Sequence, residues 1–361
     1  MSPQTLDALW RVFAWSVNAL LTGISPTHNR EQRPLEGGEQ YIAGGWRAAL
    51  IQIRGGWEFY ANVLGLPNWA SGQEMCWMCR ASNTIAELAW QACDVGAAWR
   101  RTRRSHSSYM RELEERGEPT PLIFALVVGL TLGCVMVDVL HAVDLGVASH
   151  AIANVFARCI RKRAWGGRTY DQNVAALGEE VKTWYKRNKG GARIQGELTW
   201  ERLKTTNGWP KLKAKAAATR HLAEFALELA KQHCQDDPRI VAIVQLLCEF
   251  YDWLAKEGVY MGEAATSRLP QVGQNLCALY GQLAREAFDR KEKMWKMTPT
   301  FHLFLHLCEW QIPDLRLNPR SYWTYADENL VGSLVEVAES CHVSTLAATS
   351  MTKWVLLFFG N

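Results

Sequence analysis

The sequence predicts a mostly α-helical protein with a small α/β part. Apolar residues recur at helical spacing over most of the chain, which predicts amphipathic helices. One short apolar run, Ala48–Ile53, ends at the glycine pair Gly55–Gly56 and is typical of a buried strand. The 361 residues are 48% hydrophobic and 21% charged, an ordinary globular composition for one large domain or two smaller ones.

The formal net charge of +4 is compatible with a polyanionic partner but is too small to indicate one by itself. Ten cysteines without paired spacing predict reduced thiols in an intracellular protein and exclude a disulfide scaffold. Seventeen tryptophans is a high count, and we expect most of them to anchor a core or a groove. The first residues lack the charged start and the small-residue cleavage site of a secretory signal.

The first hundred residues alternate predicted helices with loops. Residues 5–22 have apolar positions at helical spacing, and residues 23–44 form a polar loop rich in Gly, Pro, Asn and Glu. The strand at Ala48–Ile53 leads into a predicted helix over Trp57–Leu64. A longer helix is expected from Asn83 to Arg104, and it ends in the cluster WRRTRR.

The run Pro121–Val137 has 17 residues without a charge, which is the lower limit for a membrane-spanning helix. We favour a buried segment over a membrane span. The run contains Gly129 and Gly133, and Asp138 and His141 follow directly at its end. A membrane-associated helical protein is the lesser alternative.

The chain before residue 297 is otherwise expected to be overwhelmingly helical. Short helices alternate with Gly-rich loops over residues 164–210. Longer helices are predicted over residues 139–163, 211–233, 238–256 and 270–296. The helix over residues 211–233 has the clearest pattern, with a basic first half.

Four potential metal ligands occur as two pairs far apart in the chain. His302 and His306 lie four residues apart on a predicted helix, so both rings project from one face. Cys76 and Cys79, more than two hundred residues earlier, form a C-x-x-C pair. Two thiolates and two imidazoles are the ligands of a closed tetrahedral zinc site, and we predict that these four residues form one.

Each pair also has a simpler explanation. A lone C-x-x-C is compatible with a redox pair or a chance spacing, and histidines on an apolar helix are commonly hydrogen-bonded core residues. Four other residues are rival ligands: Cys93, His106, His141 and Cys308. Asp138 and His141 suggest an acid–base pair, although a buried structural hydrogen bond is the favoured interpretation.

Basic residues occur in groups that alternate with tryptophans. We predict that six of these basic residues contact DNA: Arg101, Arg103, Arg104, Lys211, Lys213 and Lys215. Such interleaving suits phosphate contacts combined with stacking on bases. The alternative is solvated helix ends, where positive charge is favoured near the C-terminus.

Four segments, in order, resemble the catalytic domain of eukaryotic cut-and-paste DDE/D transposases, with most similarity to the CACTA and Plavaka-like groups. RGGWEFYANVLGLPNWASGQEMCWMCRAS resembles the family's strand–GD–helix followed by C-x-x-C, and DVLHAVDLGVASH resembles its D-x-x-H followed by LG. KMTPTFHLFLHL is similar to the proline-led helix with HxxxH, and SYWTYADENLVGSL to the helix with the last catalytic carboxylate. Transib-like recombinases share this layout, and their Cys and His residues bind zinc.

The resemblance implies a partial RNase H-like core interrupted by a large helical insertion. The core with C-x-x-C would span residues 1–80, the insertion 81–296, and the returning helices with HxxxH and a terminal acid 297–361. Family members use three carboxylates to hold two Mg²⁺ or Mn²⁺ ions that act on DNA phosphodiesters. Glu328 and Asp138 are the family-equivalent acids. Gly56 stands where an aspartate is expected, and the first aspartate would fall before Met1.

We therefore expect a transposase-derived domain that is catalytically inactive, because a two-metal site without its carboxylates leaves the cleavage transition state unstabilised. The alternative is a non-enzymatic, zinc-stabilised DNA-binding or scaffold protein. The expected cofactor is structural zinc, with Mg²⁺ or Mn²⁺ only if an active site is completed. DNA is the expected partner and the nucleus the expected location. No membrane contact is expected, and homo-oligomerisation is left open.

Overall fold

The computed structural model describes residues 3–70 and 73–359, which fold into helices and turns. The prediction of a mostly α-helical protein is confirmed. Within this described part, strand pairing is limited to isolated β-bridges, and no sheet forms. The chain divides into two compact units, Met1–Tyr322 and Trp323–Asn361.

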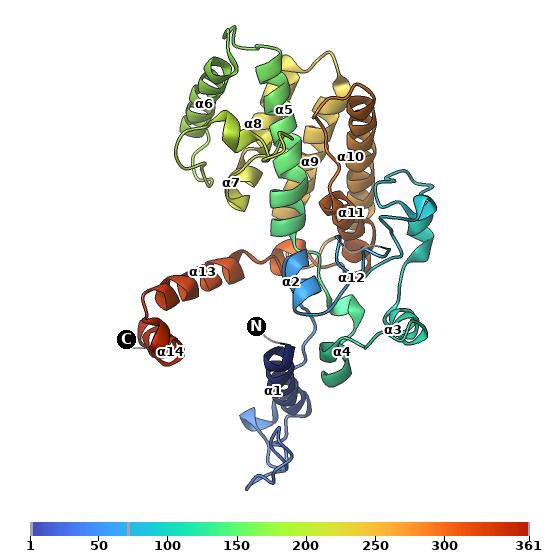
Figure 1. Cartoon of the computed structure of the whole chain (residues 1–361), viewed down its shortest axis with the longest axis vertical. Coiled ribbons are helices and arrows are strands. Elements are labelled where there is room, and N and C mark those ends of the chain that lie inside the picture. The colour runs from blue at the N-terminus through green and yellow to red at the C-terminus, as the bar shows by residue number, and fades with distance from the viewer. Residues whose placement is uncertain (1–2, 71–72, 360–361) are drawn as a thin grey trace. The chain divides into compact units, whose positions relative to one another are not determined.

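The first unit contains a layer of four helices that pack side by side (Figure 1). They are α5 (Ser149–Arg161), α8 (Ala223–His233), α9 (Pro238–Lys256) and α10 (Glu263–Asp289). Almost every residue of α5 is buried, so this helix is in the core rather than at its edge. The apolar stripes of α8, α9 and α10 face one another, and their polar faces remain in water.

A π-helix, η5 (Leu140–Ala148), runs directly into α5. The continuous stretch Leu140–Arg161 is the one helix of the described residues with the length and composition of a membrane span. However, 89% of its most apolar window is buried inside the protein, as in the core helix of a globular fold. The run Pro121–Val137 instead forms one short helix over Leu122–Leu126 and a 3₁₀ turn over Leu132–Cys134, and more than half of its residues are buried.

The helix that carries the two histidines packs against both η5 and α10. This helix, α11 (Pro299–His306), continues without a break into a second π-helix, η7 (Leu307–Gln311), and then α12 (Ile312–Leu315). Two glycines permit the close packing. A Cβ at Gly146 would lie 2.7 Å from Cβ of Thr300, and a Cβ at Gly273 would lie 2.6 Å from Cβ of Cys308.

Six further helices belong to the first unit: α1 (Pro3–Thr22), α2 (Trp57–Asn62), α3 (His106–Glu115), α4 (Leu122–Leu126), α6 (Tyr170–Arg187) and α7 (Ala216–His221). Their starts follow ordinary capping chemistry. Ser105 caps α3 and Thr169 caps α6, each in a capping box with the third helical residue. The prediction of a helix over residues 5–22 is confirmed by α1.

Three local predictions are wrong. Ala48–Ile53 is not a buried strand: it has no regular secondary structure and is largely exposed, and only Ile53 forms a bridge, with Val135. Asn83–Arg104 is not a helix but a loop with the 3₁₀ turns η2 (Ala86–Leu88) and η3 (Ala98–Thr102). The helix expected over residues 211–233 starts only after residue 215 and is interrupted at residue 222.

The second unit consists of α13 (Tyr325–Glu339), the turn η9 (Val343–Thr345) and α14 (Leu346–Phe359). The two helices contact each other as a hairpin. Glu328 lies in the first turn of α13. The four predicted metal ligands all belong to the first unit.

Candidate metal centre

The C-x-x-C pair lies in a tight loop closed by backbone hydrogen bonds. Glu74 and Ser82 form an antiparallel bridge, and the backbone N–H of Met75 donates to the carbonyl of residue 81 at 3.1 Å. Inside the loop, Sγ of Cys76 accepts the N–H of residue 78 at 3.3 Å, and Sγ of Cys79 accepts the N–H of residue 81 at 3.3 Å. Each sulfur therefore receives a donor two residues ahead, which stabilises a thiolate.

The loop lies against α11, where both histidines turn toward it. Nε2 of His302 lies 3.3 Å from Sγ of Cys79, and Nε2 of His306 lies 3.4 Å from the same sulfur. The four ligand atoms, with Sγ of Cys76, all lie within 4.8 Å of one another, and all four residues are fully buried. Zinc bond lengths of about 2.3 Å to sulfur and about 2.0 Å to nitrogen put a sulfur and a nitrogen roughly 3.5 Å apart on one tetrahedron.

The protonation states required for metal binding are partly present. Burial lowers the pKa of His306 to about 4, helped by the charge of His302, so its imidazole is neutral at pH 7. Burial opposes ionisation of Cys76, but hydrogen bonding to Cys79 and the nearby imidazoles outweigh it and lower its pKa well below the usual value. Burial and the charge of Cys76 raise the pKa of Cys79. A divalent cation between the sulfurs would allow both thiolates to form.

Aromatic packing orients the two imidazoles. The Trp99 ring meets His302 edge-on at 4.5 Å and His306 at 5.2 Å between ring centroids. On the other side, Trp310 stacks on His306 at 4.1 Å. In the described structure, the Nδ1 atoms of both histidines are buried without a hydrogen-bond partner. The rings are therefore held by the tryptophans, with their Nε2 atoms directed at the sulfurs.

Arg104 braces the C-x-x-C loop from behind. One guanidinium nitrogen donates to the carbonyls of Cys76 and Cys79, at 2.7 and 2.8 Å. The other nitrogens donate to Glu112 at 2.8 Å and to Glu74 at 2.5 Å. Only 1% of this side chain is exposed. The prediction that Arg104 contacts DNA is corrected, because its donors are used inside the protein.

The other predicted DNA contacts differ in how exposed they are and in whether they pair with an acid. Arg103 forms an ion pair with Asp314 and lies over the Trp310 ring. Arg101 is exposed. Of the second group, Lys213 and Lys215 are exposed, whereas Lys211 is half-buried.

Asp138 and Gly56, two positions that match catalytic positions of the transposase family, lie close together in the first unit, apart from the metal centre. Oδ2 of Asp138 lies 2.6 Å from Nδ1 of His141 and also accepts the His141 backbone N–H at 3.1 Å. Gly56 lies against the same histidine, since a Cβ there would be 3.0 Å from Cδ2 of the ring. Asp138 and His141 line a small hollow of about 40 Å³ together with Tyr60 and Thr300. Glu328 is in the second unit.

The rival ligands do not join the metal centre. Cys93 and Cys308 lie near Cys277 in a separate buried thiol group, where burial and the neighbouring thiols raise the pKa of Cys277. His106 accepts the backbone N–H of Leu132 at 3.2 Å and packs on Phe124.

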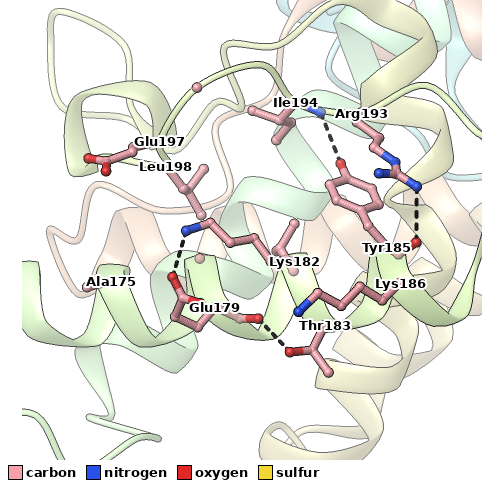
Figure 2. A pocket seen from close by; sticks show the side chains of 13 residues that line it. Ala175, Glu179, Lys182, Thr183, Tyr185, Lys186, Arg193, Ile194, Glu197 and Leu198 are labelled. Carbon is pink, nitrogen blue, oxygen red and sulfur yellow. Dashed lines mark hydrogen bonds and ion pairs between the residues drawn. The ribbon is translucent and has the colours of Figure 1, made fainter.

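A larger cavity of about 500 Å³ lies between α6 and the segment Arg193–Leu198 (Figure 2). Two of its charged side chains make contacts within the chain. Lys182 contacts Glu179 at 2.6 Å, and Arg193 donates to the backbone carbonyl of Tyr185 at 3.3 Å. None of the predicted site residues lines this cavity.

No protein-family model, curated protein or solved structure matches the chain. Sequence reasoning missed Trp99, Trp310 and the bracing role of Arg104. A signal for Trp310 was present, because it follows His306 at the same four-residue spacing that separates the two histidines.

Proposed function

We propose that this chain is a transposase-derived domain that binds DNA, contains one structural zinc ion and does not cut DNA. The observation that carries the proposal is the convergence of two thiols and two imidazoles from segments more than two hundred residues apart. The same pairs, in the same order, are part of the sequence resemblance to DDE/D transposases and to Transib-like recombinases.

Zinc is the metal that this ligand set favours. Two sulfurs and two imidazole nitrogens at tetrahedral spacing suit zinc, whereas Mg²⁺ and Ca²⁺ prefer oxygen ligands. Four protein ligands fill a tetrahedron and leave no position for a substrate or a water, so the ion would be structural. Two thiolates also neutralise its charge inside a fully buried site.

A remnant of an RNase H-like core is part of this proposal. Ile53 and Val135 form a parallel bridge, so the segments that precede Gly56 and Asp138 run side by side in the same direction. The N–H of Ile53 donates to residue 134 at 2.7 Å, and its carbonyl accepts from residue 136 at 2.8 Å. The contact of Gly56 with His141 supports the alignment that puts a family aspartate at this position.

The absence of cleavage follows from the same position. Glycine offers no side-chain oxygen to a metal ion, so Asp138 lacks the neighbouring carboxylate that the family arrangement would give it. Two divalent ions close together need several carboxylates around them. The hydrogen bonds to His141 give the Asp138 carboxylate a structural role instead.

Metal analysis of the purified full chain tests the centre. We expect one zinc ion per chain, retained through dialysis, and loss of this zinc in Cys79→Ser. The matched control is Cys134→Ser, since Cys134 is also a free cysteine and lies outside the centre. A wild-type chain that retains no zinc, or a Cys79→Ser variant that retains it fully, would contradict the proposed centre.

Two further assays test the DNA part of the proposal. A labelled duplex oligonucleotide should bind with a dissociation constant that rises steeply with salt, because phosphate contacts release counterions. A supercoiled plasmid incubated with Mg²⁺ or Mn²⁺ should remain uncut. Nicking by the wild-type chain that vanishes in Glu328→Gln would show that the active site is intact.

A further inference from the structure

The loop that precedes α7 and the loop that precedes α11 lie against each other. One loop spans residues 204–215 and the other residues 290–298. Nζ of Lys293 donates to the carbonyl of Asn207 at 3.1 Å, and its Cδ lies 3.7 Å from where a Cβ at Gly208 would be. Nζ of Lys296 lies 6.0 Å from the ring centroid of Trp209. The chain thus joins two segments about ninety residues apart.

This contact brings Lys293 and Lys296 against the loop that carries Lys211, Lys213 and Lys215. These five residues are here called the lysine surface. Four of them are exposed and Lys211 is half-buried. Within the described residues, no ion pair joins any of the five to a carboxylate. Two acids close to these lysines in the sequence pair with other residues, Glu201 with Lys204 and Glu292 with Arg290.

Lys211 and Lys296 lie close enough for their charges to repel each other. Burial lowers the pKa of Lys211, and the charge of Lys296 lowers it further. Beneath them, burial lowers the pKa of His150 to about 4, again with contributions from Lys211 and Lys296. A bound anion would relieve this repulsion, whereas a bound cation or a neutral ligand would not.

We propose that the lysine surface is where this protein holds the phosphate backbone of duplex DNA. This inference deepens the proposed function, on which it rests, by naming Lys293 and Lys296 as partners of the lysines predicted from sequence. The only aromatic ring at the surface, among the described contacts, is Trp209, and it is half-buried beneath Lys296. The surface therefore offers charge without an open stacking platform, which suits a duplex better than a single strand.

The test measures the affinity of the full chain for a fluorescent duplex oligonucleotide of mixed sequence, at KCl concentrations of about 50 to 200 mM. The test variant is Lys211→Gln with Lys296→Gln. The control variant is Lys231→Gln with Lys256→Gln, which removes the same charge from exposed positions of α8 and α9. If both test lysines contact phosphates, the salt slope falls by about 2 and the affinity near 100 mM salt falls roughly 10- to 60-fold. The control should change neither quantity by more than about twofold.

A second variant guards against misfolding. Lys213→Gln with Lys215→Gln alters only exposed side chains and should reduce the slope by a similar amount. Equal loss in the control and test variants would overturn the inference while leaving DNA binding intact. A wild-type chain without salt-dependent DNA binding would instead overturn the proposed function. A duplex RNA of the same sequence that binds more than about tenfold more tightly would overturn the assignment to DNA.

Discussion

Replacing Arg104 by lysine keeps a positive charge behind the C-x-x-C loop but removes a branched donor. In the native structure, one guanidinium nitrogen serves the carbonyls of both cysteines, at 2.7 and 2.8 Å. The remaining donors serve Glu112 and Glu74. An ammonium is a point donor on a flexible stem, so it cannot serve the two carbonyls and the two carboxylates together.

The expected loss follows from these contacts. At least two charge-assisted hydrogen bonds disappear, each with a contribution of about 1.5–3 kcal/mol. Because the site is buried, the free energy of unfolding should fall by roughly 3–5 kcal/mol, as for other broken buried pairs. The loop would also present its sulfurs less well, which should weaken zinc binding about 10- to 100-fold.

The assay compares zinc transfer to a chromogenic chelator with thermal unfolding in the presence and absence of zinc. If Arg104 positions the thiolates, Arg104→Lys loses more stability with zinc than without it. Equal losses in both states, with an unchanged zinc transfer rate, would refute this reasoning. The control is Arg103→Lys. The side chain of Arg103 is about half exposed and pairs with Asp314 outside the loop.

Two further predictions concern stability. Gln311 accepts from the N–H of Val137 at 2.8 Å and donates to the carbonyl of Val135 at 3.1 Å, so Gln311→Met leaves two buried backbone groups unpaired. Its free energy of unfolding in urea should fall by about 2–4 kcal/mol. Burial lowers the pKa of His150 to about 4, so between about pH 6.5 and pH 4 the unfolded state binds a proton that the folded state does not. Stability should therefore fall by about 3 kcal/mol as the pH drops through this window, and urea titrations of His150→Gln should lack this component.

The metal ligands were accessible to sequence reasoning because helical geometry fixes where His302 and His306 point. The two residues between Cys76 and Cys79 likewise limit how far apart the sulfurs can be. What the sequence could not supply was the choice among thiols, since Cys308 lies on the same helical segment as the histidines. That choice depends on α11 packing against the loop on one face and against α10 on another.

Arg104 shows where charge patterns mislead. It belongs to the cluster WRRTRR, which resembles a solvated, DNA-facing group when only neighbouring residues are considered. Its environment is instead made by Glu74, thirty residues earlier, and by Glu112, eight residues later. A buried arginine requires such distant acids, and local composition does not reveal them.

The missed elements share a physical cause. Asn83–Arg104 contains enough apolar residues for a helix, but its tryptophans satisfy their N–H groups within the loop. Trp90 donates to Asn83 and Trp99 to the carbonyl of residue 92. Ala48–Ile53 has strand composition but finds one pairing partner only at Ile53, so no ladder extends along it. In both cases tertiary contacts decide between conformations that the local pattern leaves open.

The metal centre and the Asp138 position are joined by one extended segment. Ile53 hydrogen-bonds one edge of residues 134–136, and the side chain of Gln311 hydrogen-bonds the other edge at residues 135 and 137. Gln311 ends the π-helix that continues directly from the histidine-bearing helix. Zinc bound by that helix would therefore also fix the segment that leads to Asp138. The ion would contribute to folding whether or not a carboxylate is present at residue 56. A chain that has lost catalysis would therefore still need the metal centre for its stability.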